Sequence, residues 1–558
     1  MTAVHLSYLA RSELVTSGDG ATLSLSPNLA RERVSFDGEV KDPVRFREAM
    51  SALHEVVVGD LRRPKKDRTA YLRWKKEESE REAKLLSQFA SEAEKKESAK
   101  LGKKAPPPNL EQDFRRAHSQ YWRARVDWAN DLSRNDPLLF RHLVPCDPVI
   151  TVAPDTVFFE AFSKDESSYG CLYVDRGAFS GASNVALGTT NVDYSNALYD
   201  HLQSLRTYRS TRLLLDPKGF EVQVLGRADH REEKIDLPGT WLRGFGQISA
   251  ATALGGSLVT LPVELVYSML AFLKRRREKT GPRSIRFRLV PGKPPEVVLD
   301  PWNEVLVSRG PAYEGPTRQE VKIWGRRRLL TLARTLPLAD RVEVLLLGSG
   351  LPSIWVVRMG DMRFVLALSG WTTNDWTGSL ALDLLAGNLR HDLRTMQRIE
   401  KHLVTERSAT LDGLARATDA GRDLLLGSLV KLAKQGQVVF DYATSRYRYR
   451  SILPVPLAEA STGPESEEIL EAERILAERA VQLERQEPAP SGRLLIVGKA
   501  AKTSCEAMLD ADGRFVRARC SCSHFHRNGL RAGPCRHLFA LRVAFDRQSS
   551  TSSDQLLH

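Results

Sequence analysis

The segment from Cys520 to Leu541 reads CSCSHFHRNGLRAGPCRHLFAL, and its spacing of cysteine and histidine decides the fold of the C-terminal part of the chain. A Cys-x-Cys pair is separated from a Cys-x-His pair by twelve residues. Residues two apart in a helix point away from each other, so Cys535 and His537 converge only if Cys535 lies at the start of a helix. Pro534 favours such a start, because proline is common in the first helical turn. The spacing therefore predicts a compact unit closed around one metal ion.

The predicted ligands are three thiols and one imidazole, namely Cys520, Cys522, Cys535 and His537. Four of the six cysteines lie in the last tenth of the chain, which favours metal binding over a disulfide framework. Three thiolates and one imidazole fill the positions of a tetrahedral Zn²⁺ ion and leave no place for water. A catalytic zinc keeps one position free for water or substrate. We therefore expect one structural Zn²⁺ ion and no catalytic residue here.

This arrangement resembles the SWIM zinc finger, in which strands precede Cys-x-Cys, a variable loop follows, and Cys-x-His leads into a helix. The predicted ligands match that pattern position by position, and Phe525, Leu538 and Leu541 suit it as well. Other segments resemble long bacterial proteins of the SWIM zinc finger family more loosely: Phe158–Glu160, Ser163–Tyr169, Gly188–Ser195 and Ser369–Trp376. SWIM modules accompany helicase-like ATPases, transposases and recombination factors and are taken to bind DNA or proteins. The resemblance therefore implies a protein partner, such as an ATPase, or a nucleic-acid partner.

Other residues near this segment are alternative ligands. His524 and His526 follow the first cysteine pair closely and could replace His537, although the spacing of the SWIM pattern favours His537. The remaining cysteines are interpreted as buried thiols, because a free cysteine usually packs as a small apolar residue. They are Cys146, Cys171 and Cys505.

Basic residues surround the predicted ligands. Three thiolates around one dication leave a local charge of about −1, which neighbouring arginines can offset. The same arginines can instead contact the phosphates of a nucleic acid, and both roles stay open at this point. The candidates for nucleic-acid or partner binding in this segment are Arg517, Arg519, Arg527, Arg531, Arg536 and Arg542.

Residues 391–452 have the element order of a winged helix, with a helix, a short helix, a turn, a longer helix and a β-hairpin. In such a fold the longer helix could enter a major groove while the hairpin reaches phosphates. Because the longer helix offers few polar side chains, a protein partner fits equally well. The candidate contact residues are Arg422, Lys431, Lys434, Arg446 and Arg448, with Arg450 on the same strand as the last two.

The whole chain has 558 residues, a formal charge of +13 and a pI near 9.4. It is too long for one hydrophobic core, and its 42% of apolar and 27% of charged residues are typical of globular proteins. No apolar run approaches the ~20 residues that cross a bilayer, and Met1–Ala10 lacks the pattern of a signal peptide. We therefore expect a cytoplasmic protein without a membrane partner, whose charge is compatible with phosphate contacts.

The pattern of apolar runs predicts an α+β, multidomain protein with a mixed α/β central core, a winged-helix-like domain and a small C-terminal zinc finger. The predicted segments are an N-terminal α+β segment (1–58), a charged helical insertion (59–145), a central α+β domain (146–390), the winged-helix-like domain (391–452), a linker and charged helix (453–490), the SWIM zinc finger (491–548) and a disordered tail (549–558).

Known catalytic motifs are not found in the sequence. Gly498-Lys499 lacks the residues that flank a Walker motif, and His54-Glu55 lacks the second histidine of a zincin helix. We therefore expect a non-enzymatic adaptor or scaffold that binds a protein or nucleic-acid partner. Two alternatives stay open: a DNA-binding protein without sequence specificity that acts in DNA transactions with a separate ATPase, and an enzyme of unrecognised type in residues 146–390.

Overall fold

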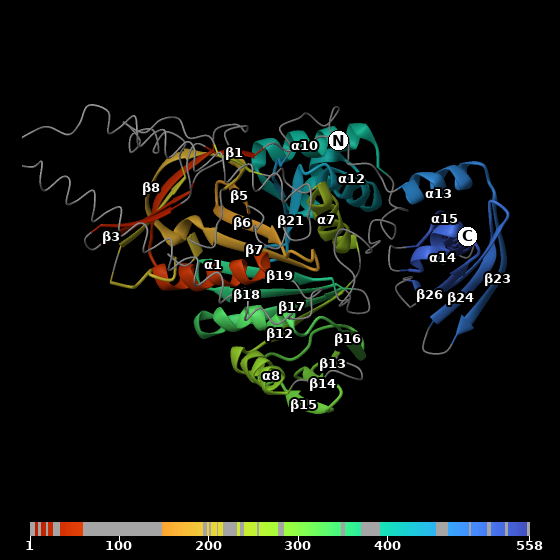
Figure 1. Cartoon of the computed structure of the whole chain (residues 1–558), viewed down its shortest axis with the longest axis horizontal. Helices are drawn as coiled ribbons and strands as arrows, with labels where there is room; N and C mark the ends of the chain where they lie inside the picture. Colours follow the sequence, from red (N-terminus) through yellow and green to blue (C-terminus); the bar gives the residue numbers. More distant parts are fainter. Residues whose placement is uncertain are drawn as a thin grey trace, which may run out of the picture. The chain divides into compact units, whose positions relative to one another are not determined.

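The computed structural model describes residues 6–8, 13–17, 20–25, 34–59, 148–192, 198–199, 202–208, 210–215, 232–234, 239–253, 256–276, 284–347, 352–369, 391–452, 467–489, 493–509, 515–530 and 534–554. Helices combine with several β-sheets over these residues, so the chain is an α+β protein with more than one domain, as predicted (Figure 1). The predicted charged insertion (59–145) lies outside the described residues apart from Gly59, and so does the linker that precedes residue 467.

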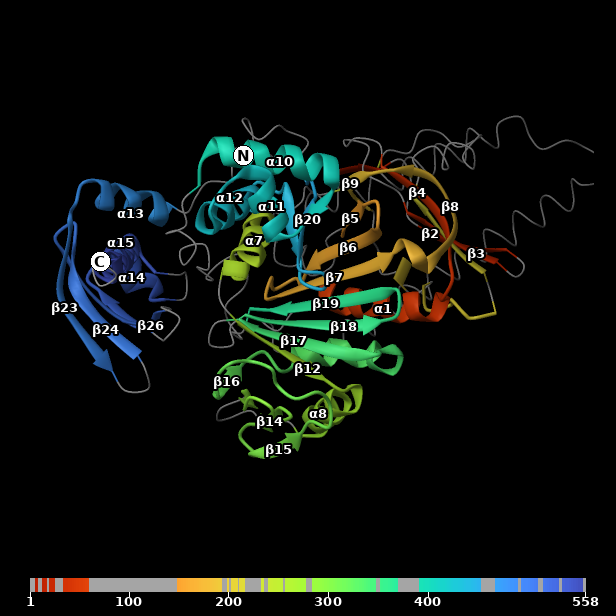
Figure 2. The same cartoon turned by 180° about the vertical axis from the view of Figure 1, so that it is seen from behind.

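The central region is built on an eight-stranded antiparallel sheet (Figures 1 and 2). Its strands lie in the order β12 (Gly256–Leu261), β17 (Arg341–Leu347), β18 (Ser353–Met359), β19 (Met362–Leu368), β7 (Ser168–Asp175), β6 (Thr156–Phe162), β5 (Val149–Val152) and β9 (Gly188–Asn191). Every residue of β6 and β19 is buried, as expected for strands covered on both faces. Phe364 of β19 lies opposite Leu172 of β7, so the middle of the sheet depends on pairing between distant segments.

Helix α1 (Pro43–Val57) packs on this sheet at β6, β7 and β19. It begins where the Asp42 side chain accepts a hydrogen bond from the backbone N–H of Arg45, with Pro43 in the first turn. Phe46 and Leu53 bury its inner face. The strand before it belongs to a second sheet, with the order β2 (Glu13–Ser17), β3 (Gly20–Leu25), β10 (Ser210–Leu215), β4 (Ser35–Val40) and β8 (Phe179–Ala186). Strand β1 (Leu6–Tyr8) pairs with β11 (Glu232–Lys234).

A second strand and helix, β12 followed by α8 (Val263–Arg275), precede a four-stranded sheet. The order in this sheet is β15 (Glu304–Val307), β14 (Glu296–Leu299), β13 (Ile285–Leu289) and β16 (Gln319–Ile323). The other helices that the structure describes in this region are η1 (Arg176–Ala178), α7 (Gly239–Ala250), η2 (Ala251–Ala253), η3 (Arg328–Arg334) and η4 (Leu336–Leu338).

The winged-helix order predicted for residues 391–452 is confirmed. The elements are α10 (Leu393–Glu406), β20 (Ser408–Ala409), α11 (Leu411–Thr418), α12 (Arg422–Lys434), β21 (Val438–Asp441) and β22 (Arg446–Tyr449), and the sheet order is β20, β22, β21. The Asp392 side chain caps α10 by accepting from the N–H of Thr395, and Thr410 caps α11 in the same way. A separate apolar core holds these elements together and includes Ile399, Leu403, Leu414, Leu425 and Leu429.

The C-terminal unit has its own sheet and its own apolar core. The strand order is β23 (Val481–Ala489), β24 (Arg493–Ala500), β25 (Thr503–Leu509) and β26 (Phe515–Cys520), and the helices are α13 (Glu467–Ala477), α14 (Ser523–Asn528) and α15 (Arg536–Asp554). Helix α15 packs on β24 and on α13, a helix that the prediction groups with the linker. Gly498 permits the close approach, because a Cβ there would lie 2.4 Å from the Gln482 carbonyl oxygen and 2.6 Å from Leu541 Cδ1.

Two further observations concern the helices. Helix α15 continues to Asp554, into the segment 549–558 for which a disordered tail is predicted. Among the residues that the structure describes, no helix combines the length and the apolar character that a membrane span requires.

Candidate metal centre

The predicted ligands are carried by the end of β26 and the starts of α14 and α15. Cys520 is the last residue of β26, Cys522 is the N-cap of α14, and Cys535 and His537 flank the first residue of α15. Their ligand atoms all lie within 4.8 Å of one another. Cys520 and Cys535 are buried, whereas Cys522 and His537 are partly exposed. The structure thus brings the predicted residues together as a group that could hold a metal ion.

The start of α15 explains why two residues of one helix can face the same point. The carbonyl of Cys535 accepts a hydrogen bond from the N–H of Phe539 at 3.0 Å, so Cys535 stands at the helix boundary rather than inside the first turn. Two residues inside a helix that are two positions apart point in different directions. Because Cys535 lies at the boundary, its side chain can point to the same place as that of His537. Pro534 is buried and lies two residues before Arg536, the first residue of α15, so it precedes the first turn in which a proline is expected.

The imidazole of His537 has a defined neighbour on each nitrogen. Nδ1 lies 3.7 Å from Sγ of Cys520, and Nε2 lies 3.3 Å from Oγ1 of Thr503. In a tetrahedral zinc site with Zn–S near 2.3 Å and Zn–N near 2.0–2.1 Å, neighbouring ligand atoms are roughly 3.5–3.8 Å apart. The geometry therefore fits Nδ1 as the metal-binding atom and leaves Nε2–H to donate to the Thr503 hydroxyl.

Neighbouring thiols and burial oppose the ionisation of two of the predicted ligands. The adjacent thiol of Cys505 and burial raise the pKa of Cys520 to about 12, and the adjacent Cys520 and burial raise the pKa of Cys535 to about 12. A bound dication reverses this preference, because coordination releases the thiol protons and stabilises the thiolates. Three sulfurs and one imidazole nitrogen are donors that suit Zn²⁺.

The alternative ligands lie outside the group. His524 Nδ1 is 3.2 Å from a carboxylate oxygen of Glu468 on α13, and the side chain of His526 is exposed. Cys505 is buried and lies 3.8 Å from Cys520, sulfur to sulfur, without joining the group of four. Cys171 is buried in β7 as expected, and Cys146 lies outside the described residues.

Glu468 is a contact that the sequence did not indicate. Its carboxylate accepts hydrogen bonds from the backbone N–H of Arg536 at 2.6 Å and from the Arg536 guanidinium at 2.8 and 3.2 Å. Burial opposes the charge of Glu468, but the bonds from Arg536 outweigh it and lower its pKa. Glu468 thereby fixes α13 to the first turn of α15, next to two of the ligands. Only the three-dimensional fold brings it there, since 68 residues separate it from Arg536.

The arginines around the finger fall into two groups. Arg517, Arg519 and Arg527 are exposed, whereas Arg536 is engaged by Glu468 and Arg542 is half-buried, with its guanidinium 5.8 Å from the Phe545 ring centroid. Arg531 lies outside the described residues. The exposed group is therefore the part of the predicted basic surface that a partner can reach.

Helix α12 is covered on both sides, unlike a helix that reads a DNA groove. Its residues from Leu425 to Val430 are all buried. Leu425 contributes to the winged-helix core, and Val430 belongs to the apolar cluster of the central region, where α7 lies alongside α12 (Figures 1 and 2). Arg422 is exposed at the N-terminal end, while Lys431 and Lys434 are half-buried; a Cβ on Gly246 of α7 would lie 2.3 Å from Lys434 Cγ. Of the two roles left open for this helix, docking in a major groove is disfavoured, because α7 occupies one of its faces.

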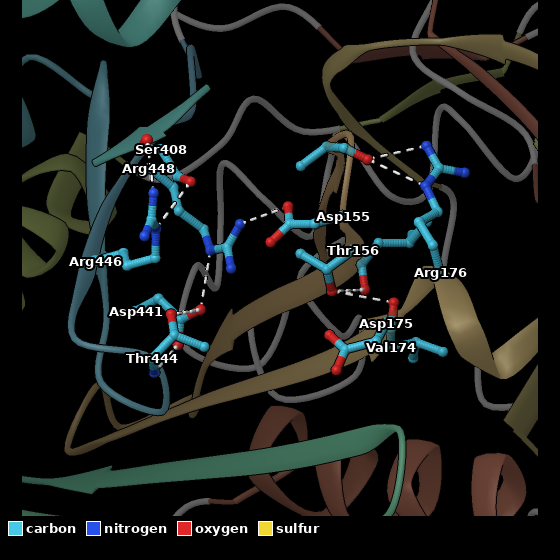
Figure 3. Close-up of polar contacts among 12 residues, drawn as sticks. Asp155, Thr156, Val174, Asp175, Arg176, Ser408, Asp441, Thr444, Arg446 and Arg448 are labelled. Carbon is cyan, nitrogen blue, oxygen red and sulfur yellow. Dashed lines mark hydrogen bonds and ion pairs between the residues drawn. The ribbon is translucent and has the colours of Figure 1, made fainter. Parts of the chain in front are cut away.

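The arginines of the predicted wing point into the chain. Arg448 is 1% exposed; its Nε lies 2.9 Å from Asp441 and its Nη1 lies 2.8 Å from Asp155 (Figure 3). Burial opposes its charge, yet the hydrogen bond to Asp155 and the charges of both carboxylates outweigh burial and raise the pKa of Arg448. The expectation that Arg448 contacts phosphates or a partner is wrong for this reason. Arg446 is half-buried and donates to Oγ and to the carbonyl oxygen of Ser408 at 3.1 Å each (Figure 3).

Comparison with known proteins gives little beyond this geometry. No protein-family model matches the chain, and the comparison with curated proteins found no match. Among solved structures, the chain is similar to Proliferating Cellular Nuclear Antigen from Entamoeba histolytica, with 13% identity, 40% of this chain and 89% of that chain covered, and a TM-score of 0.29. A second is A. fulgidus PCNA bound to the C-terminal region of FEN-1, with 11% identity, 40% of this chain and 89% of that chain covered, and a TM-score of 0.28. A third is PCNA from Thermococcus kodakaraensis, with 13% identity, 40% of this chain and 90% of that chain covered, and a TM-score of 0.29. TM-scores of this size support no conclusion about fold or function.

Proposed function

We propose that this chain is a non-enzymatic adaptor with a SWIM-type zinc finger, which holds one structural Zn²⁺ ion and binds a protein or nucleic-acid partner. The observation that carries the proposal is the convergence of Cys520, Cys522, Cys535 and His537, whose ligand atoms lie within 4.8 Å of one another. Four protein donors leave no position for a water nucleophile, which favours a structural role over a catalytic one. The SWIM resemblance adds an ATPase as the protein partner to look for, in the cytoplasm.

The finger presents a group of exposed cations that a partner can reach. Arg517 and Arg519 lie two residues apart on β26, so they share one face of its sheet, and both are exposed, as is Arg527 on α14. Such a group favours an anionic partner, either an acidic protein surface or nucleic-acid phosphates. Helix α12 and Arg448 are engaged within the chain, and we therefore assign partner binding to the finger.

Zinc content tests the metal assignment. Purified protein should contain one equivalent of zinc by elemental analysis, and Cys535→Ala should lose it, because the binding free energy of such a finger, on the order of 10 kcal/mol, is also folding free energy. His526→Ala is the matched control, since His526 is an exposed histidine next to the ligands and should keep the metal. Full zinc retention in Cys535→Ala would remove the ligand assignment.

Partner binding is tested with an arginine variant. Arg517→Ala combined with Arg519→Ala should weaken partner capture, whereas Arg474→Ala on α13, a side chain that is 68% exposed, should not. Capture repeated after nuclease treatment separates a protein partner from nucleic acid. Direct DNA binding, the second candidate, demands an affinity that falls steeply between about 50 and about 300 mM salt; no shift at any salt concentration in that series eliminates it.

A further inference from the structure

We propose that Cys505 and Cys520 form a dithiol that a peroxide converts to a disulfide, so that oxidation releases the metal ion from the finger. The inference rests on the proposed zinc site and adds a mode of regulation to it. It gives a role to Cys505, a buried thiol that the ligand set leaves unused.

The strand register places the two cysteines opposite each other. Cys505 of β25 pairs with Cys520 of the antiparallel strand β26, and their sulfurs are 3.8 Å apart. Directly opposed residues of antiparallel strands have Cα atoms about 4.5–5.5 Å apart, which lies inside the range that a disulfide spans, about 4.4–6.8 Å. Rotation of the two side chains can therefore close the bond with little movement of the backbone.

Cys505 touches the ligand set from outside. Its sulfur donates to the carbonyl oxygen of Thr503 at 3.3 Å and contacts Cys520, but it is not among the four residues whose ligand atoms converge. A tetrahedral ion is saturated without it. Redox-sensing cysteines often lie next to a second, resolving cysteine, and Cys505 lies next to Cys520 in this way.

The chemistry balances with a hydroperoxide as the oxidant. The Cys520 thiolate attacks one peroxide oxygen, so that an S–O bond forms and the O–O bond breaks, and the resulting sulfenic acid and hydroxide account for the first step. The hydroxide takes up a proton from solvent and leaves as water. The Cys505 thiol then attacks the Cys520 sulfur, so that the S–S bond forms and the S–O bond of the sulfenic acid breaks. The departing hydroxide takes up the proton of the Cys505 thiol and leaves as a second water. Two thiols lose two electrons in total, and hydrogen peroxide gains them.

Loss of Cys520 leaves only Cys522, Cys535 and His537 as donors, and the ion is no longer enclosed. Small oxidants can approach from the side of Cys522 and His537, which are both partly exposed. The unit does not have to unfold completely, because Ile496, Leu538 and Leu541 belong to an apolar core of its own. Reduction can then restore the site.

The test uses the full-length, zinc-loaded protein treated with hydrogen peroxide. Zinc release is followed with a chromogenic chelator, and disulfides are mapped by mass spectrometry after alkylation. The wild-type protein should release its zinc while a peptide pair linked through Cys505 and Cys520 appears, and a dithiol reductant with added zinc should reverse both. Cys505→Ser should keep its zinc and release it more slowly, on the order of tenfold. Cys171→Ser, which alters a buried thiol of β7, should behave as the wild type.

Wild-type release rates in a zinc-loaded Cys505→Ser protein, or a mapped bond from Cys520 to Cys522 or Cys535, would overturn the proposal. If Cys505→Ser does not take up zinc, the disulfide that mass spectrometry maps in the oxidised wild-type protein decides whether the proposal holds. Wild-type protein that is purified without zinc contradicts the proposed metal site instead, and the Cys505–Cys520 link can still be sought in it. The two failures are therefore distinguishable.

Discussion

Arg450 and Glu160 form an ion pair in which both side chains are completely buried, with Nη1 of Arg450 3.2 Å from each carboxylate oxygen of Glu160. Tyr169 donates its hydroxyl to the same carboxylate at 2.7 Å, and the guanidinium lies 4.0 Å from the ring centroid of Phe245. Burial raises the pKa of Glu160, although Arg450 and Tyr169 act in the opposite direction. Because Arg450 directly follows β22 and Glu160 lies on β6, the pair ties the winged-helix part to the eight-stranded sheet.

Replacing Arg450 by alanine should destabilise the protein by about 3–5 kcal/mol, because it leaves the Glu160 carboxylate buried without a counter-charge. Urea unfolding of the full chain measures the loss, and Arg450→Met combined with Glu160→Gln should recover part of it. Arg485→Ala is the control, since its pair with Glu487 is 57% and 51% exposed and should contribute less than about 1 kcal/mol. An Arg450→Ala protein as stable as the wild type would contradict the role of the pair.

Thr503→Val should weaken zinc binding without removing a ligand. The hydroxyl of Thr503 lies 3.3 Å from Nε2 of His537, and loss of such a partner typically lowers metal affinity about 10- to 100-fold. Competition with a chelator of known affinity measures the change. Ser504→Ala, one residue away and exposed, should leave the affinity unchanged. Equal affinities of Thr503→Val and wild type would mean that Nε2 does not need this contact.

Glu468→Ala should loosen the first turn of α15. Three hydrogen bonds from Arg536 end on this carboxylate, and bonds to a charged group contribute roughly 1.5–3 kcal/mol. Hydrogen exchange at the backbone amides of α15 should accelerate accordingly. Glu471→Ala provides the comparison, because its carboxylate lies 3.7 Å from Arg536 and should matter less. Similar exchange in both variants would show that Glu468 has no special role.

Acidification should destabilise the packing of α1 through His54. Burial, with the nearby charges of Lys164 and Arg334, lowers the pKa of His54 from 6.5 to about 4, and its ring stacks on Tyr199 with 3.6 Å between centroids. The unfolded chain therefore takes up a proton first, so this contribution is complete above about pH 6.5 and is lost as the pH falls towards 4.

The full loss through His54 is about 3.4 kcal/mol, because its pKa is lowered from 6.5 to about 4 and one pKa unit corresponds to about 1.36 kcal/mol; about 2 kcal/mol of it is lost between pH 7 and pH 5. The urea midpoint at pH 7 and pH 5 measures it. His54→Phe should remove much of the difference between the two pH values, and His391→Gln, at an exposed position, should not. A pH dependence that is unchanged in His54→Phe would assign it to other groups.

The group of three cysteines and one histidine that could hold a metal ion could be predicted, because it depends on local spacing. Cys520 and Cys522 are separated by one residue, Pro534 marks the helix start, and the order of winged-helix elements likewise follows from short-range periodicity and caps such as Thr410. Local signals of this kind act within a few residues, so they can be recognised in the sequence without knowledge of the rest of the fold.

The roles of the arginines could not be predicted in the same way. A charged residue read from sequence is assumed to face water, but Arg448 finds Asp155 at a separation of 293 residues, and Glu468 finds Arg536 across 68. The burial of α12 has the same origin, because its second apolar face, with Val430, is covered by a helix from another part of the chain. Compensation between distant charges and covering of one element by another are properties of the folded state alone.

The inward course of β22 sets a condition on how this protein can be dissected. A fragment of residues 391–452 would lack Glu160 and Asp155, which pair with Arg450 and Arg448. The guanidinium of Arg450, the Nη1 donor of Arg448 and one apolar side of α12 would then face solvent. Guanidinium groups that have lost their carboxylate partners attract polyanions, whatever they do in the native protein. Retention of such a fragment on DNA would then be an artefact of cutting, whereas the intact chain, with its carboxylates in place, reports the affinity that the native charge balance allows.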